Sequence, residues 1–251
     1  MGMGLLFDAT RCIGCGACSS ACKEQNKLPG PVEEVLTAYT WTTLQTREGL
    51  NMRRMCMHCE VPTCASVCPV AALVKTPEGP VVYDGQRCMG CRYCMMACPF
   101  EVPKYQWDRP VPVIGKCVLC ASRIKEGKPT ACAEACPAEA TIFGKREDLV
   151  WEARTRLRQK PGAYVDHIYG LGEAGGTSVL MIANAPFDSS ASRPTCRRNP
   201  RPCAPGRCCP TSPTLLRSGA SCSMGCTGSP PAGRPSPTPK RRIPIRRTGH
   251  E

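Results

Sequence analysis

Short apolar runs separated by polar and turn residues predict small strands and short helices. Residues 5–7 form an apolar run that predicts a strand leading into the first cysteines. The runs 72–76 and 80–84 flank Pro77-Glu78-Gly79 and predict a β-hairpin. Residues 32–54 carry scattered apolar positions, and we expect extended structure there rather than a long helix.

Towards the other end of the chain, the pattern predicts one helix and two strands. Residues 147–159 show helical periodicity and predict an amphipathic helix that ends at Pro161-Gly162. Residues 164–169 and 178–183 predict strands around a glycine-rich turn, 170–176. That turn lacks the Lys-Ser/Thr pair of a phosphate-binding P-loop, so we interpret it as structural.

Between these elements, sixteen cysteines fall into four runs. The third run, 88–98, reads C-x2-C-x2-C-x3-C-P, and the first run, 12–22, has the same spacing with Lys23 in place of proline. The second run, 56–68, widens the middle spacing by two residues, and the fourth, 117–136, widens it further. The runs therefore alternate between two types.

An internal repeat links the first and third runs. Phe7-Asp8-x2-Arg11-Cys12-x-Gly14-Cys15 recurs 76 residues later as Tyr83-Asp84-x2-Arg87-Cys88-x-Gly90-Cys91. A glycine between the first two cysteines suits the close backbone approach that a bulky cluster requires.

This spacing is typical of [4Fe–4S] ligation. A loop that turns three thiolates towards one point wraps a cuboidal cluster, and the fourth cysteine usually ligates a companion cluster. Disulfides are the alternative in short secreted chains, and zinc is bound by separated C-x2-C pairs. Triplets that end in Cys-Pro favour iron–sulfur chemistry over both, so we expect four [4Fe–4S] clusters.

Two pairings of the runs are compatible with this exchange of fourth ligands. In the nested pairing the second and third runs exchange, and the first and fourth close across them. The ligand sets are then Cys12, Cys15, Cys18 with Cys136; Cys117, Cys120, Cys132 with Cys22; Cys56, Cys59, Cys64 with Cys98; and Cys88, Cys91, Cys94 with Cys68. The alternative joins the first run to the second and the third to the fourth. The nested pairing predicts an α+β fold in which one ferredoxin-like unit, 50–112, is inserted into another, 1–49 plus 113–186.

Composition supports metal sites as the stabilising element. The 251 residues include 22 cysteines but only 5% aromatic residues, which is poor material for a conventional core. The formal charge of +13 is concentrated in residues 187–251, which hold 12 Lys or Arg against two acids. The remainder is +3, and four oxidised clusters with their thiolates would bring it to about −5. The basic pI is therefore a weak argument for nucleic-acid binding.

Residues 187–251 predict a disordered basic tail rich in Pro, Arg and Ser. Its six cysteines follow no ligand spacing. Two hypotheses account for it: a frameshifted reading of GC-rich codons, or a genuine tail that binds an anionic membrane surface. The sequence has no 18-residue apolar stretch and opens without a secretory leader pattern, so we expect neither a transmembrane helix nor a signal peptide.

A family resemblance rests on the four runs and on five further segments. These are His58-Cys59-Glu60-x-Pro62-x-Cys64, Cys98-Pro99-Phe100, Cys117-x2-Cys120-x2-Arg123, Tyr164-x2-His167-Ile-Tyr169-Gly170 and Gly175-Gly176-Thr177-Ser178-Val-Leu180. Over residues 4–187 the chain resembles the four-cluster electron-transfer subunits of membrane-bound molybdenum or tungsten oxidoreductases and hydrogenases. Formate dehydrogenase beta subunits, dimethyl sulfoxide reductase iron–sulfur subunits and the hydrogenase-2 iron–sulfur protein are members. The resemblance implies the nested pairing and a wire of clusters from a catalytic subunit to a membrane quinone-reactive subunit.

No constellation of side chains predicts catalysis by this chain, and we expect no catalytic residues. His58 lies between two predicted ligands, where it either tunes a cluster through a hydrogen bond or lies at the surface. The basic residues beside the runs either raise cluster potentials or are solvated: Arg11, Lys23, Arg53, Arg54, Arg87, Arg92, Lys116 and Arg123.

Two functions fit these features. The first is a subunit that conducts electrons between a catalytic partner (molybdopterin type or hydrogenase) and a membrane quinone-reactive partner, and is membrane-associated through them. The second is a free polyferredoxin that serves several enzymes. The predicted strand–turn extension, 164–183, favours the first, because a free carrier needs no docking arm. We expect no nucleic-acid partner.

Overall fold

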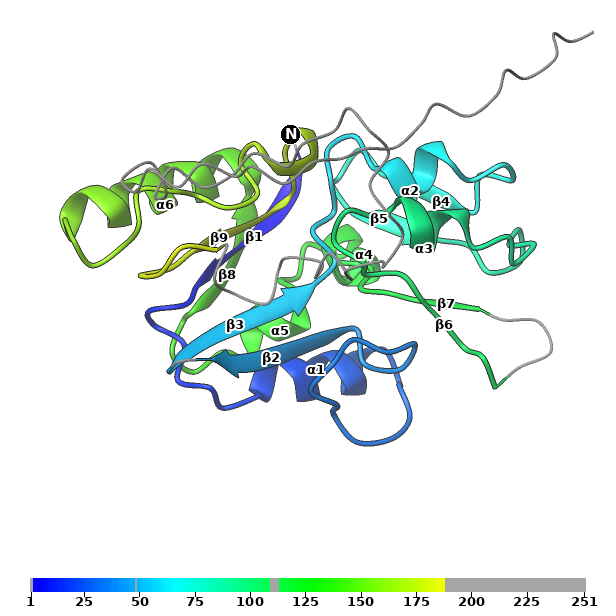
Figure 1. Ribbon diagram of the computed structural model, residues 1–251, viewed down its shortest axis with the longest axis horizontal. Coiled ribbons are helices and arrows are strands. Elements are labelled where there is room, and N and C mark those ends of the chain that lie inside the picture. The colour runs from blue at the N-terminus through cyan, green and yellow to red at the C-terminus, as the bar shows by residue number, and fades with distance from the viewer. Residues whose placement is uncertain (1, 48, 109–112, 188–251) are drawn as a thin grey trace, which may run out of the picture. The chain divides into compact units, whose positions relative to one another are not determined.

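The computed structural model describes residues 2–47, 49–108 and 113–187 (Figure 1), all within one compact unit, 1–199. The predicted tail beyond Phe187 lies outside the described residues, so its disorder and its frameshift origin stay predictions. The described part is a mixed α+β fold of small strands and short helices, as the sequence predicts.

A three-stranded sheet of order β8-β1-β9 forms the centre of the fold (Figure 1). The apolar run at the start of the chain is β1, Met3–Asp8, as predicted. It pairs antiparallel with β8, Thr141–Lys145, and parallel with β9, Val179–Ile182. Because β1 is the middle strand, segments from both ends of the described chain meet on it.

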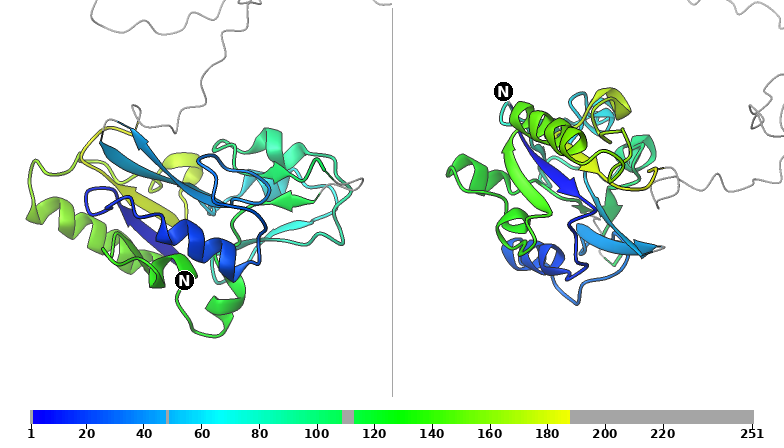
Figure 2. Two further views of the ribbon diagram at one scale, coloured as in Figure 1. Left: turned by 90° about the horizontal axis from the view of Figure 1, so that it is seen from below. Right: turned by 90° about the vertical axis from the view of Figure 1, so that its left-hand side faces the viewer.

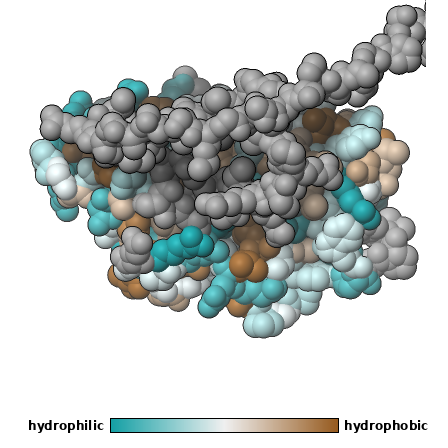
Figure 3. Space-filling view, in the orientation of Figure 1, coloured by the Kyte–Doolittle hydropathy of each residue, from teal (hydrophilic) through white to brown (hydrophobic). Residues whose placement is uncertain are grey.

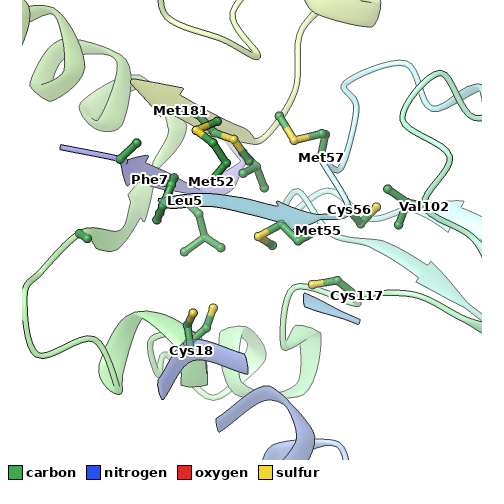
Figure 4. Packing of buried hydrophobic residues seen from close by; sticks show 14 of the residues in the cluster. Leu5, Phe7, Cys18, Met52, Met55, Cys56, Met57, Val102, Cys117 and Met181 are labelled. Atoms are coloured by element: carbon green, nitrogen blue, oxygen red, sulfur yellow. The ribbon is translucent and has the colours of Figure 1, made fainter. Parts of the chain in front are cut away.

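The two faces of this sheet are covered differently. Helix α6, Arg146–Gln159, is the predicted amphipathic helix and lies along one face (Figure 2), with Leu149 and Ala153 against Leu6 of β1. The opposite face carries Leu5 and Phe7, which face a core rich in methionine and cysteine (Figure 4).

The described residues also form three two-stranded hairpins, of which one packs on this core and two pack in a separate apolar cluster. The predicted hairpin is confirmed as β4, Leu73–Lys75, with β5, Val81–Tyr83. The extended stretch contains β2, Thr42–Arg47, which pairs with β3, Leu50–Met55. The third hairpin is formed by two short strands: β6, Lys104–Tyr105, and β7, Ile114–Gly115.

Short helices lie within or beside the cysteine runs. They are α1, Ala17–Gln25; α2, Thr63–Ser66; α3, Tyr93–Ala97; α4, Ala121–Lys125; and α5, Ala131–Glu134. A 3₁₀ turn, η1, Glu173–Gly175, occupies the glycine-rich turn. On the visible face, hydrophobic and hydrophilic residues are interspersed around these elements (Figure 3).

The predicted strand at 164–169 is wrong. Backbone hydrogen bonds join this segment to β9 at Val165 and at Tyr169, but a tight turn, with the His167 N–H donating to the Val165 carbonyl, interrupts it between them. Only an isolated bridge, Tyr169 with Met181, remains. Strand β9 is itself fully buried as an edge of the central sheet, so its residues are a structural part of the fold. A docking role for the segment 164–183 stays a prediction.

Candidate metal centres

The first group of thiols joins the first cysteine run to the fourth. A cavity beside Phe7 and Leu44 is lined by Cys12, Cys15, Cys18 and Cys136, which we call quartet I. Burial raises the pKa of the Cys12 thiol, and the neighbouring Cys18, Cys136 and Cys15 raise it further.

A second cavity holds the reciprocal set. Quartet II consists of Cys117, Cys120, Cys132 and Cys22, with Arg53 and Asn26 also in the cavity wall. Burial raises the pKa of Cys22 to about 12, and Cys132 adds to that effect. Quartets I and II therefore exchange their fourth cysteines between the first and fourth runs.

The remaining cysteines form two groups in the second and third runs. Quartet III is Cys56, Cys59, Cys64 and Cys98. Burial raises the pKa of Cys59 to about 11, and Cys56 and Cys98 raise it further. Burial also raises the pKa of Cys64, to which Cys56, Cys98 and Cys59 add. Quartet IV lines a third cavity and consists of Cys88, Cys91, Cys94 and Cys68.

The structure thus gathers the sixteen cysteines into the four sets of the nested pairing, and not into those of the sequential alternative. Ligation of a cluster by each quartet remains a prediction.

Local backbone geometry produces these groupings. Gly14 and Gly90 have φ angles of 73° and 74°, the left-handed conformation that glycine adopts without strain. After each Cys-Pro, the residue three positions beyond the cysteine is also left-handed, and its N–H closes a turn onto the cysteine carbonyl. These residues are Ala71, Glu101 and Glu139. The first run differs because Lys23 allows α1 to continue to Gln25.

The donors around the sulfurs fit anionic thiolates. The N–H of Leu119 donates to the Cys117 sulfur at 3.3 Å, and that of Ala72 donates to the Cys68 sulfur at 3.2 Å. All sixteen cysteines are free thiols rather than disulfides. Burial disfavours ionisation, so a bound metal centre would supply the charge that keeps buried sulfurs deprotonated.

The spacing of the thiols suits a multi-iron cluster better than a single ion. Among the described residues, no three His, Cys, Asp or Glu side chains converge closely enough to hold one metal ion. A tetrahedral zinc site requires such convergence, whereas a cuboidal cluster presents its irons at separate corners. Quartets I, II and IV line cavities, so the residues present there fit [4Fe–4S] centres.

Arg53 of β3 lies between quartets I and II and is only 2% exposed. Its guanidinium donates to the hydroxyls of Thr42 and Thr141, at 3.0 and 3.1 Å. Burial alone would lower the pKa of Arg53, but the sulfurs of Cys132 and Cys18 raise it above its ordinary value. Burial alone would raise the pKa of Cys132, but the neighbouring Arg53 lowers it below its ordinary value. A solvated position for Arg53 is therefore wrong.

Lys116 is also buried, at 2% exposed. Its ammonium donates to the carbonyls of Val81 and Cys117 and lies near Cys64 of quartet III. Lys23, where the other runs have proline, donates to the carbonyls of Pro29 and Tyr39.

Four of the other basic residues beside the runs contact surface partners. Arg11, Arg87 and Arg123 pair with the carboxylates of Glu139, Asp84 and Glu134, and Arg92 stacks 4.4 Å from the centre of the Trp107 ring.

His58 is fully buried, so a surface position is wrong. Its Nδ1 accepts the N–H of Val81 at 2.9 Å, which leaves the ring hydrogen on Nε2. Burial lowers the pKa of His58 well below its usual value, and Lys116 and Lys75 lower it further. The ring is therefore neutral and links the second run to β5, and its tuning of a cluster stays a prediction.

Comparisons with known proteins place the chain in a family. Residues 48–146 match the family described as "4Fe-4S dicluster domain", and residues 3–24 match "4Fe-4S binding domain". The chain is 37% identical over 234 residues to the hydrogenase-2 operon protein HybA of Escherichia coli O157:H7, covering 74% of this chain and 71% of that protein. The chain belongs to the ferredoxin-type [4Fe–4S] electron-transfer subunits of membrane-bound oxidoreductases and hydrogenases.

The chain is also similar to two further relatives. The chain is 31% identical over 197 residues to the nitrate-inducible formate dehydrogenase iron–sulfur subunit of E. coli K12, covering 70% of this chain and 66% of that protein. It is 45% identical over 205 residues to a protein of Nitratidesulfovibrio vulgaris, covering 74% of this chain but 55% of that relative. The chain therefore spans little more than half of that relative's length. Within the described residues, no helix is both long and apolar enough to cross a membrane.

Proposed function

We propose that the chain relays electrons through four [4Fe–4S] clusters between a catalytic partner and a membrane quinone-reactive partner. The catalytic partner would be of molybdopterin or hydrogenase type, and membrane association would come through the partners. The observation that carries the proposal is the division of sixteen cysteines into four sets of four. When bound, each [4Fe–4S] centre takes up and releases one electron.

The order of the quartets supports conduction along a line. Arg53 adjoins Cys18 of quartet I and Cys132 of quartet II. Cys117 of quartet II is an electrostatic neighbour of Cys56 of quartet III, and both lie in the same part of the core (Figure 4). Quartets III and IV share a third apolar cluster that contains Cys64, Cys88 and Cys94. Electrons would therefore pass from I through II and III to IV, or in reverse.

The ends of this line lie near the surface. Ile13, between the first two cysteines of quartet I, is 67% exposed, and Met89, at the same position of quartet IV, is 64% exposed. Each end would meet a different partner, as a relay requires.

A free polyferredoxin is the alternative. The relatives named as subunits of formate dehydrogenase and dimethyl sulfoxide reductase favour a complex-bound role. Affinity purification of the tagged full chain from its own host tests this: we expect a redox catalytic chain to co-purify in a fixed ratio. Recovery of the chain alone, with all its clusters, from gently solubilised membranes and cytosol would favour the free carrier.

A further inference from the structure

Two tyrosines, one buried and one half-buried, distinguish quartet IV from quartet I, although the two sites are related by the internal repeat. Tyr105 of β6 is 4% exposed, and its hydroxyl oxygen lies 3.7 Å from the Cys94 sulfur. Tyr83 of β5 is half-buried and packs in the same apolar cluster as Cys88; burial raises the pKa of Tyr83, and the neighbouring Cys88 raises it further.

A metal-bound thiolate can only accept a hydrogen bond, so at a loaded quartet IV the hydroxyls of both tyrosines would be the donors. The Tyr105 hydroxyl, beside the Cys94 sulfur, would donate to it. The oxygen of Tyr83 accepts the N–H of Ile114, which lines the cavity, at 3.3 Å, and its O–H is free to donate to the neighbouring Cys88.

The repeat provides an internal comparison. Tyr83 stands five residues before Cys88, and the equivalent residue before Cys12 is Phe7, which lines the quartet I cavity. At corresponding positions of the repeat, a phenol packs near Cys88 of quartet IV and a phenyl ring lines the cavity of quartet I. A phenyl ring fills the same space but cannot donate to sulfur.

We propose that Tyr83 and Tyr105 are positioning residues that raise the reduction potential of the cluster at quartet IV by donating hydrogen bonds to its thiolates. A reduced cluster carries one more negative charge, so a donor to its ligand sulfur stabilises the reduced state more than the oxidised state. This inference rests on the proposed function, because it requires a cluster at quartet IV.

The test is a redox titration of the purified holoprotein, followed by electron paramagnetic resonance, with Tyr83→Phe, Tyr105→Phe and the double variant. Tyr93→Phe is the matched control: it lies in the same run, next to Cys94, but is 57% exposed. A Cys91→Ser variant identifies which signal belongs to quartet IV. We expect the midpoint potential of that signal to fall in each single variant and further in the double variant, with the other signals unmoved.

Three results would overturn the inference. The first is an unchanged potential in the double variant while Cys91→Ser confirms that the cluster is present. The second is an equal shift in Tyr93→Phe. The third is that Cys91→Ser loses neither a signal nor iron relative to the wild-type protein. That result would overturn the proposed function at this site as well, and the iron content separates it from the other two.

Discussion

The exchanged fourth cysteines are the residues on which the nested arrangement depends. Cys98 belongs by sequence to the third run but lies among Cys56, Cys59 and Cys64. The N–H of Glu101 closes a backbone turn onto the carbonyl of Cys98.

We predict that Cys98→Ser disturbs the cluster of quartet III and leaves that of quartet IV intact. Cys68→Ser, its counterpart in the second run, should do the reverse and serves as the matched variant. Paramagnetic resonance of both reduced proteins measures this. Loss of the same signal in both variants would contradict the exchange.

A second prediction concerns the buried cation. Arg53→Gln removes a positive charge shared by quartets I and II, so the reduction potentials of both clusters should fall. A fall of roughly 60 mV would be a tenfold change in the equilibrium constant for one electron. Arg54→Gln, at the next position of the same strand, is the control. Equal shifts in the two variants, or a shift in all four signals, would show that Arg53 acts through the fold alone.

Cysteine spacing allowed the four sets to be predicted, because metal ligation restricts it strongly. Arg53 could not be singled out, since Arg54 beside it has the same chemistry. The register of β3 against β2 places Arg53 opposite Leu44, and this pairing turns Arg53 inward. The sequence carries no signal for that choice.

Among the elements, local patterns were predictable and distant pairings were not. The hairpin of β4 and β5 and the helix α6 follow from turn residues and helical periodicity. The parallel pairing of β1 with β9 joins segments more than 170 residues apart in sequence, and nothing local encodes it. The strand predicted at 164–169 does not form, because the His167 N–H donates to the Val165 carbonyl and closes a turn inside the segment.

The central sheet offers a test of its own. A Cβ added to Gly4 of β1 would lie 2.2 Å from the carbonyl oxygen of Ser178, which belongs to the chain leading into β9. Gly4→Ala should therefore destabilise the protein by about 1–3 kcal/mol, the usual cost of overpacking. Gly172→Ala, with open space around it, is the control. Thermal unfolding with equal midpoints for the two variants would contradict this packing.

At the scale of the whole molecule, the clusters are expected to supply much of the folding energy. The chain contains few aromatic residues. Ten of the sixteen quartet cysteines lie in or against two apolar clusters: the core beside Leu5 and Phe7, and the cluster shared by quartets III and IV. Where metal binding organises such an interior, its free energy is also folding free energy.

The measurement that tests the account most directly is the iron and acid-labile sulfide content of the full chain, prepared without oxygen. Four quartets predict about sixteen iron and sixteen sulfide per chain. About eight of each in fully reconstituted protein would mean that two quartets hold no cluster, and would contradict the relay of four.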